Sequence, residues 1–227
     1  MAQPMQTGAA TQAQAPAYPV LRVAAVAWLC VYVPAYAATY GAWHFLFLCN
    51  LGVLVTALGL IAGNQLMISS QALIAPGIAL LWIADAGTRL LNGHFLHGGT
   101  AYMWDASIPA LTRALSLYHL AWPPLLYYAL RRHGYDRRAP WLQGALVFGA
   151  LALGLMAAPP AENIDYVWHA PGAATPAAAP PLRALEILGV LVVVIGWPLH
   201  RLCRALFEPV ASTRAPAALA GTAATTR

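Results

Sequence analysis

The most reactive combination in this chain is an arginine, a serine and a histidine inside one apolar stretch. Arg113, Ser116 and His119 follow one another at steps of three within SIPALTRALSLYHLAWPPLL. Histidine acts as a general base or acid, serine supplies a nucleophile, and arginine clamps a carboxylate or phosphate. Together they indicate a membrane enzyme that acts on lipid.

The same three residues also have structural interpretations, which the sequence leaves open. His119 fits a hydrogen-bonded core position within an apolar run. Ser116 either pairs with His119 or bonds its own helix backbone. Arg113 also suits a purely structural role, in which it neutralises an acid on a neighbouring helix.

Five further polar side chains are expected to share a pocket with this group. Asp85 and Arg89 lie four residues apart, hence on one helical face, as either a structural ion pair or a reactive pair. Asn50 suits a hydrogen bond between helices. The expected pocket residues are Asp85, Arg89, Asn50, His44 and Glu186.

The sequence predicts neither a metal site nor a cofactor. His94 and His97 lie three residues apart in a loop, and whether they bind a metal stays open. Cys30, Cys49 and Cys203 sit in or beside apolar runs without CxxC spacing, as core residues do. Walker, HExxH, GxSxG and Rossmann glycine motifs are missing from the sequence, which excludes soluble-type nucleotide chemistry.

The elements that position these residues follow from composition. Hydrophobic residues make up 60% of the 227 positions and charged residues 8%, against roughly 25% charged in soluble domains. All basic side chains are arginines, and they cluster at the ends of apolar runs. This distribution indicates membrane orientation and not nucleic-acid binding. We therefore expect an all-α polytopic membrane bundle with membrane lipid as partner; protein partners are not indicated.

Six apolar stretches approach the length of about 20 residues that a membrane helix needs. They are 19–39, 42–62, 66–90, 107–130, 140–157 and 181–206. Pro76, in the middle of the third stretch, lacks a backbone N–H and should bend that helix. The bundle then covers 19–207, and the polar or Ala/Thr/Pro-rich tails 1–18 and 208–227 are predicted to be disordered.

Arginines set the expected orientation. They follow the fourth and sixth stretches as Arg131, Arg132, Arg137, Arg138, Arg201, Arg204 and Arg214. With six spans these regions share one side, which the positive-inside rule assigns to the cytoplasm together with both termini. The turn at Gly134–Arg138 is interpreted as a topology anchor in which Asp136 offsets arginine repulsion.

Ionisable residues within the spans gather in the half opposite this turn. Charge near the membrane centre costs at least ~2.5–3.5 kcal/mol per residue, so these side chains should pair and face a polar pocket that opens away from the cytoplasm. Aromatic residues near the span ends are interpreted as an interfacial belt. They are Tyr40, Trp43, Tyr102, Trp104, Tyr166 and Trp168.

Three functions fit such a pocket. The favoured one is the lipid enzyme. The second is a proton-coupled transporter with a relay through Asp85, His119 and Glu186, although the mirrored halves typical of carriers are not visible. The third is a non-catalytic assembly or scaffold protein in which the charges only lock helices together.

Several motifs resemble a group of bacterial multi-pass inner-membrane proteins with no assigned activity. The likeness rests on IPALTRALSLYHLAWPPLL and RRHGYDRRA, with WHFLFLCNL upstream and ENIDYVW and PPLRAL downstream. It extends over about 41–200. It implies a bacterial inner membrane and a similar helical bundle.

A remoter likeness is to the androgen-induced-gene group of membrane lipid hydrolases. It rests on a Trp-led helix with a polar residue near its middle, a helix ending in Asp, and a helix reading IP…H…P. That group uses an intramembrane threonine and a histidine on lipid esters, which implies that His119 corresponds to the histidine. The threonine position falls at about Phe47, which cannot act as a nucleophile.

Overall fold

A computed structural model describes residues 18–171, 173 and 176–209. Within that part of the chain, 76% of residues are helical and no strand forms, which confirms the all-α prediction. The predicted disordered tails lie outside the described residues, apart from the innermost positions. Tyr18 is buried, and the backbone carbonyl of Glu208 accepts a hydrogen bond from the Tyr135 amide.

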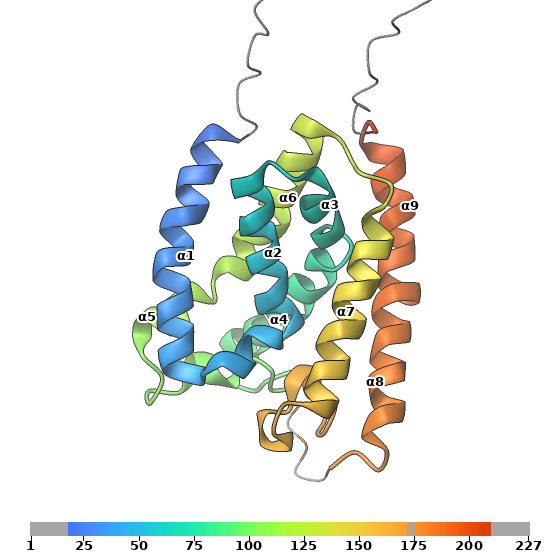
Figure 1. The fold of residues 1–227 in the computed structure, drawn as a ribbon. Coiled ribbons are helices and arrows are strands. Elements are labelled where there is room, and N and C mark those ends of the chain that lie inside the picture. Colours follow the sequence, from blue (N-terminus) through green and yellow to red (C-terminus); the bar gives the residue numbers. More distant parts are fainter. Residues whose placement is uncertain (1–17, 172, 174–175, 210–227) are drawn as a thin grey trace, which may run out of the picture.

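In the described part of the chain, the helices form six segments. These segments run side by side between two ends of the molecule (Figure 1). Several are interrupted. In chain order they are α1 (Pro19–Tyr40), α2 (Leu48–Ala62), α3 (Gln65–Gln71) with α4 (Ala75–Asn92), α5 (Ala110–Leu115) with α6 (Tyr118–His133), α7 (Ala139–Met156), and α8 (Pro180–Gly189) continuing through the π-helix η5 (Val190–Gly196) into α9 (Trp197–Leu206).

The two ends of the bundle differ in their connections. At one end, here the arginine end, the connections are short, and α1 begins and α9 finishes there (Figure 1). At the other, the loop end, the longer connections 41–47, 93–109 and 157–179 gather. The loops 91–106 and 158–180 therefore lie at the end of the bundle opposite the arginine turn.

Fewer helices qualify as membrane spans than the six predicted. Three described helices are long and apolar enough to cross a membrane: α1, α7 and the continuous Pro180–Leu206 segment. The bent pair of α3 and α4 makes a fourth if it counts as one span. α2 has only 15 residues, about 22 Å at 1.5 Å per residue, which is shorter than a hydrocarbon core of about 30 Å. α6 is also short, and it ends in Arg131, Arg132 and His133.

The interruptions have local causes. Pro76 occupies the first turn of α4, and the chain bends by 40° at the break before it, as predicted. A proline there clashes with the carbonyl four residues earlier and removes one helical hydrogen bond. Gly63 closes α2 in the left-handed conformation at φ 65°, and the Asn64 side chain then caps α3 by accepting the Met67 amide. α2 and α3 are thus held as a tight hairpin.

Polar side chains join the helices across an otherwise apolar interior. α1 packs on α2 and α5, and α4 packs on α6. The hydroxyls of Thr39 and Thr112 lie 2.9 Å apart between α1 and α5, and the Trp122 indole donates to the Thr56 hydroxyl between α6 and α2. Such interhelical bonds fix the register of helices that share an apolar surround.

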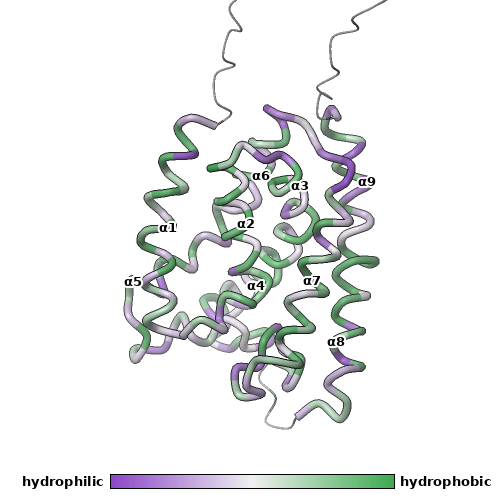
Figure 2. Tube along the Cα trace, in the orientation of Figure 1, coloured by the Kyte–Doolittle hydropathy of each residue, from purple (hydrophilic) through white to green (hydrophobic). Residues whose placement is uncertain are grey.

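Residues along the helix middles are mostly hydrophobic, and hydrophilic residues gather mainly near the two ends (Figure 2). Large side chains such as Phe148, Val193 and Val194 are more than half exposed. A soluble monomer rarely exposes that much contiguous apolar surface. The described chain therefore has the exterior of a membrane protein.

Candidate functional site

Side chains at the loop end enclose a cavity of about 360 Å³. Its walls come from α1, α2, α4, α6, the α8–η5 junction and two short 3₁₀ helices, η1 (Ala42–Leu46) and η4 (Ile164–Tyr166). The loop after α4 supplies His97, Gly99, Thr100 and Tyr102. The volume falls within the roughly 300–1,000 Å³ of small-molecule sites.

Five tyrosines form much of the cavity wall. They are Tyr36, Tyr40, Tyr102, Tyr118 and Tyr166. Those on α1 continue a stripe that starts at Tyr32, with ring centroids 4.2 Å apart between Tyr32 and Tyr36 and 5.5 Å between Tyr36 and Tyr40. The interfacial-belt interpretation is wrong for Tyr40, Tyr102 and Tyr166, because the end of α1 and two loops place these residues in the cavity wall. Trp43 and Trp104, by contrast, are exposed.

Asn50 lies where the expected pocket places it, in the cavity wall and 2% exposed. Its Oδ1 accepts hydrogen bonds from the Tyr32 hydroxyl at 2.8 Å and the Tyr118 hydroxyl at 3.1 Å. Its Nδ2 donates to the His44 carbonyl at 2.9 Å. The amide therefore ties α1, α2, α6 and η1 together, which confirms its interhelical role.

His119 also lines the cavity and is 3% exposed. Its ring lies 5.0 Å from the Trp82 ring at an interplanar angle of 5°, and it also stacks on Tyr118. Nδ1 lies 2.8 Å from the Ser116 carbonyl oxygen. Since a carbonyl only accepts, Nδ1 carries the proton and Nε2 of the neutral ring keeps a lone pair. That nitrogen has the protonation state of a general base.

Ser116 and His119 do not form a nucleophile–base pair. The Ser116 hydroxyl lies 2.6 Å from the Tyr36 hydroxyl and 3.4 Å from the Thr112 carbonyl. Only the backbone carbonyl of Ser116 reaches the imidazole. Ser116 is thus arranged as a link between α1 and the α5–α6 junction.

Arg113 lies outside the cavity wall. Its Nε and Nη1 each donate at 3.1 Å to backbone carbonyls, those of Ile108 and Met103. The Arg113 side chain is directed from α5 toward the preceding loop. Its guanidinium therefore joins that loop to α5. The expected clamp on a substrate phosphate has no counterpart in this geometry.

Asp85 and Arg89 do not pair with each other. Asp85 is fully buried and accepts from the amides of His97, Gly98 and Thr100 at 2.7, 3.0 and 2.8 Å and from the Thr100 hydroxyl at 2.6 Å. Arg89 instead donates to the Gly93 carbonyl and lies over Phe95. Because the loop residues 97–100 supply the hydrogen bonds to Asp85, Arg89 does not pair with it. Asp85 thereby positions the cavity loop.

His44 and Glu186 have opposite placements. His44 lines the cavity and stacks on Tyr40 at 4.1 Å, and burial lowers the pKa of His44 to about 4. Glu186 is exposed on α8 and lies outside the cavity wall. Ile187 of α8 and Leu191 of η5, one helical turn later, line the cavity. Glu186, next to Ile187, therefore faces away from it.

Asp165 is the cavity residue that the sequence did not single out. Its Oδ1 accepts the Leu48 amide at 2.9 Å at the start of α2, while its Oδ2 is buried without a partner among the described residues. Burial raises the pKa of Asp165 to about 7, and the Leu48 hydrogen bond opposes the shift. Asn163, Asp165 and Tyr166 all have positive φ, at 45°, 48° and 61°. Such backbone strain clusters at ligand sites.

Two further buried polar atoms of the cavity lack partners within the described chain, the Tyr40 hydroxyl and Nε2 of His97. His97 Nδ1 accepts the Gly99 amide at 3.1 Å. The neutral ring therefore carries its proton on Nε2, which makes that atom a donor. Two histidines that line the same cavity therefore have ring nitrogens of opposite character. Nε2 of His97 is a donor, and Nε2 of His119 is an acceptor. Among described residues, no three His, Cys, Asp or Glu side chains gather to hold a metal.

Some of this was legible in the sequence. Tyr32, Tyr36 and Tyr40 recur every four residues, which places them on one helical face. That spacing indicates a stripe of tyrosines on one helical face. The stripe is missed when Tyr40 is interpreted only from its position near the end of a span. Asp165 carried no comparable signal, because its position depends on how the 157–179 loop folds back onto α2.

No protein-family model, curated protein or solved structure matches this chain. The candidate site therefore rests on its own geometry.

Proposed function

We propose that the chain is a multi-pass protein of a bacterial inner membrane, with its arginine end in the cytoplasm. Seven described arginines belong to the arginine end, against the acids Asp136 and Glu208. The loop end has three arginines and five acids. Such asymmetry supports the N-in, C-in orientation under the positive-inside rule.

In this arrangement all six helical segments lie within the membrane. The two that are too short or too polar to span alone, α2 and α5–α6, pack against longer neighbours. α2 contacts α1 and α3, and α6 contacts α3 and α4. Irregular backbone at membrane depth is tolerated where protein covers it, which suits the breaks before α4 and α6.

We infer that the protein is a membrane enzyme that binds a lipid by its polar head group in the loop-end cavity. The observation that carries this is a set of three buried polar atoms without partners among the described residues, each on a residue that lines the cavity: the Tyr40 hydroxyl, His97 Nε2 and Asp165 Oδ2. An unpaired buried polar atom costs about 1–3 kcal/mol. A bound head group with both donors and acceptors removes that cost.

The chemistry supported by this cavity is proton transfer and not nucleophilic attack by serine. His119 Nε2 offers a lone pair, and Asp165 has a pKa near neutrality. A neutral imidazole with a free lone pair and a carboxyl group with a pKa near neutrality can act as a general base and a general acid. Ser116 is engaged elsewhere, so the hydrolase likeness implied by the sequence motifs is not part of the proposal.

Lipid composition of membranes that express the protein tests the proposal. Cells with the wild-type chain should differ from empty-vector cells in one lipid class with an altered head group. His119→Gln should abolish that difference, and His94→Gln should retain it, because His94 is an exposed histidine outside the cavity wall. Equal lipid profiles for wild-type and His119→Gln membranes, at equal protein abundance, would rule out His119 as the base. Equal profiles for wild-type and empty-vector membranes would rule out the enzyme.

A further inference from the structure

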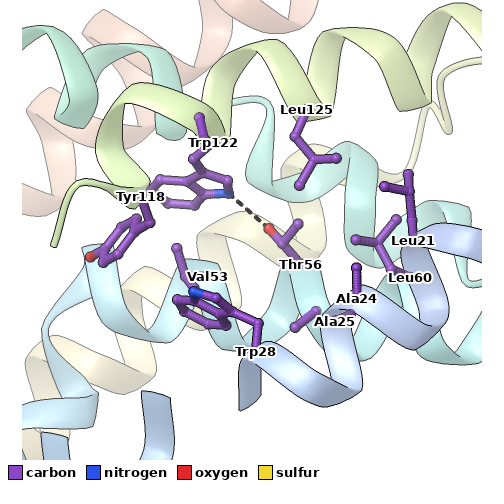
Figure 3. Close-up of a pocket in the computed structure, with 12 residues that line it drawn as sticks. Leu21, Ala24, Ala25, Trp28, Val53, Thr56, Leu60, Tyr118, Trp122 and Leu125 are labelled. Atoms are coloured by element: carbon purple, nitrogen blue, oxygen red, sulfur yellow. Dashed lines mark hydrogen bonds between the residues drawn. The ribbon is translucent and has the colours of Figure 1, made fainter. Parts of the chain in front are cut away.

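A second hollow lies next to the cavity, closer to the arginine end. It has a volume of about 250 Å³ and is bounded by α1, α2 and α6. Figure 3 shows Trp28, Tyr118 and Trp122 around one part and Leu21, Leu60 and Leu125 around the other. We call it the crevice. Its aliphatic part points toward the arginine end, since Leu21 begins α1 and Leu60 is near the last residue of α2.

The crevice offers almost nothing to a polar molecule. Its one aliphatic hydroxyl, on Thr56, donates to the Gly52 carbonyl at 2.8 Å and accepts the Trp122 indole at 2.9 Å. The Tyr118 hydroxyl is directed to Asn50 in the cavity wall. Cavities lined this way exclude water and take apolar occupants.

The crevice is also open on one flank. Ala24 of α1 and Ala121 of α6 both line it and are both exposed. Small side chains at these two positions leave an entrance between α1 and α6, with α2 as the floor. In a membrane, that flank faces lipid chains.

Tyr118 belongs to the walls of both hollows. Polar space toward the loop end and apolar space toward the arginine end therefore meet at one side chain. A membrane lipid has the same division, with its head at the interface and its chain toward the centre. The two hollows together have the polarity and the order of an amphiphile.

Resting on the proposed function, we propose that the crevice holds a hydrocarbon chain of the lipid whose head group occupies the cavity, with Tyr118 at the junction. The occupant is an acyl chain because the walls are apolar, the entrance faces the membrane and the far side shares Tyr118 with the head-group site. The crevice then selects for chain length, while the cavity selects for the head group.

Photo-crosslinking tests this assignment. The probe is a phosphatidylethanolamine with a diazirine at the end of one acyl chain, mixed into phosphatidylethanolamine–phosphatidylglycerol vesicles that contain the full-length protein. Peptides with Val53, Leu60 or Leu125 should carry the label. A second probe with the diazirine next to the ester should shift the label toward Tyr118.

Two rim variants and a control sharpen the result. Ala24→Trp and Ala121→Phe place bulk at the entrance, so each should lose crevice labelling. Ala27→Trp adds the same bulk at an exposed α1 position outside the crevice wall and should keep it. Labelling that persists in both folded rim variants, or that falls only on Ile187 and Leu191 peptides, would overturn the assignment.

The same experiment separates this inference from the proposed function. If His119→Gln abolishes the lipid change but wild-type crevice peptides stay at background labelling, the enzyme stands and the chain site fails. If crevice labelling is strong and specific while wild-type and vector membranes have equal lipids, the chain site stands and the enzyme fails.

Discussion

The turn at the arginine end and the cavity at the loop end each contain an aspartate. The two carboxylates differ in how completely they are hydrogen-bonded. Asp136 accepts three hydrogen bonds from Arg138: its backbone N–H at 2.9 Å, Nε at 3.1 Å and Nη2 at 2.8 Å. These bonds lower the pKa of Asp136. Asp165 accepts one amide and keeps one oxygen unpaired, and burial raises its pKa to about 7.

The difference separates an anchor from a binding site. A carboxylate whose oxygens are all paired within the chain has nothing left to offer a ligand. One that is buried with an oxygen free retains an unmet interaction, and the chain pays for it in stability. Asp85 is the test of this rule, because it lies beside the cavity yet has the fully paired pattern of Asp136.

The largest effect should therefore come from Asp85. Asp85→Asn replaces one acceptor oxygen by an NH₂ group that faces backbone amides, so we expect a loss of about 2–3 kcal/mol in the free energy of unfolding. Thermal unfolding in detergent, followed by tryptophan fluorescence, measures it. Asp105→Asn is the control, since Asp105 is exposed and, among the described residues, its carboxylate accepts hydrogen bonds only from Ser107. A stability equal to wild type would mean that Asp85 is not a structural anchor.

A smaller effect is expected at the turn. Asp136→Asn keeps an acceptor for the Arg138 amide but removes the charge, and exposed ion pairs contribute about 0.2–1 kcal/mol. The Arg138 side chain is 74% exposed, which limits the loss to that range. The same unfolding assay should give a shift well below that of Asp85→Asn. A larger shift would show that the turn, and not the cavity loop, is the better-stabilised region.

The fold was largely readable from the sequence, whereas the cavity was readable only in part. Apolar runs and Pro76 predicted the segments and the bend, because hydrophobicity and proline geometry act locally. The structure brings His119, Asn50 and His44 together in one cavity wall. It leaves Glu186, Arg89 and Arg113 outside that wall, because their outward or loop-directed orientation depends on a helix face that one turn of periodicity cannot define.

Asp165 marks the limit of prediction for a different reason. Its carboxylate reaches the Leu48 amide across 117 positions of sequence, through a loop with three left-handed residues. No local pattern encodes such a contact. The same long reach explains why Tyr102 and Tyr166, which come from two separate loops, were assigned to a belt and not to a cavity wall.

At low pH the smallest change in stability is expected for Asp165→Asn, and the same variant should have the largest effect on the pH dependence of stability. The pKa of Asp165 is about 7 in the folded chain, above its ordinary value of 3.8. Between pH 3.8 and pH 7 the folded chain therefore keeps a proton on Asp165 that the unfolded chain has released. Stability should then fall as pH rises from about 4 to about 7 and level off above it. Asp165→Asn should remove that slope while changing stability at low pH very little. Melting temperatures of wild type, Asp165→Asn and Asp136→Asn over this pH range measure it. A slope that survives in Asp165→Asn but disappears in Asp136→Asn would reverse the roles of the two aspartates, and with them the contrast between anchor and binding site.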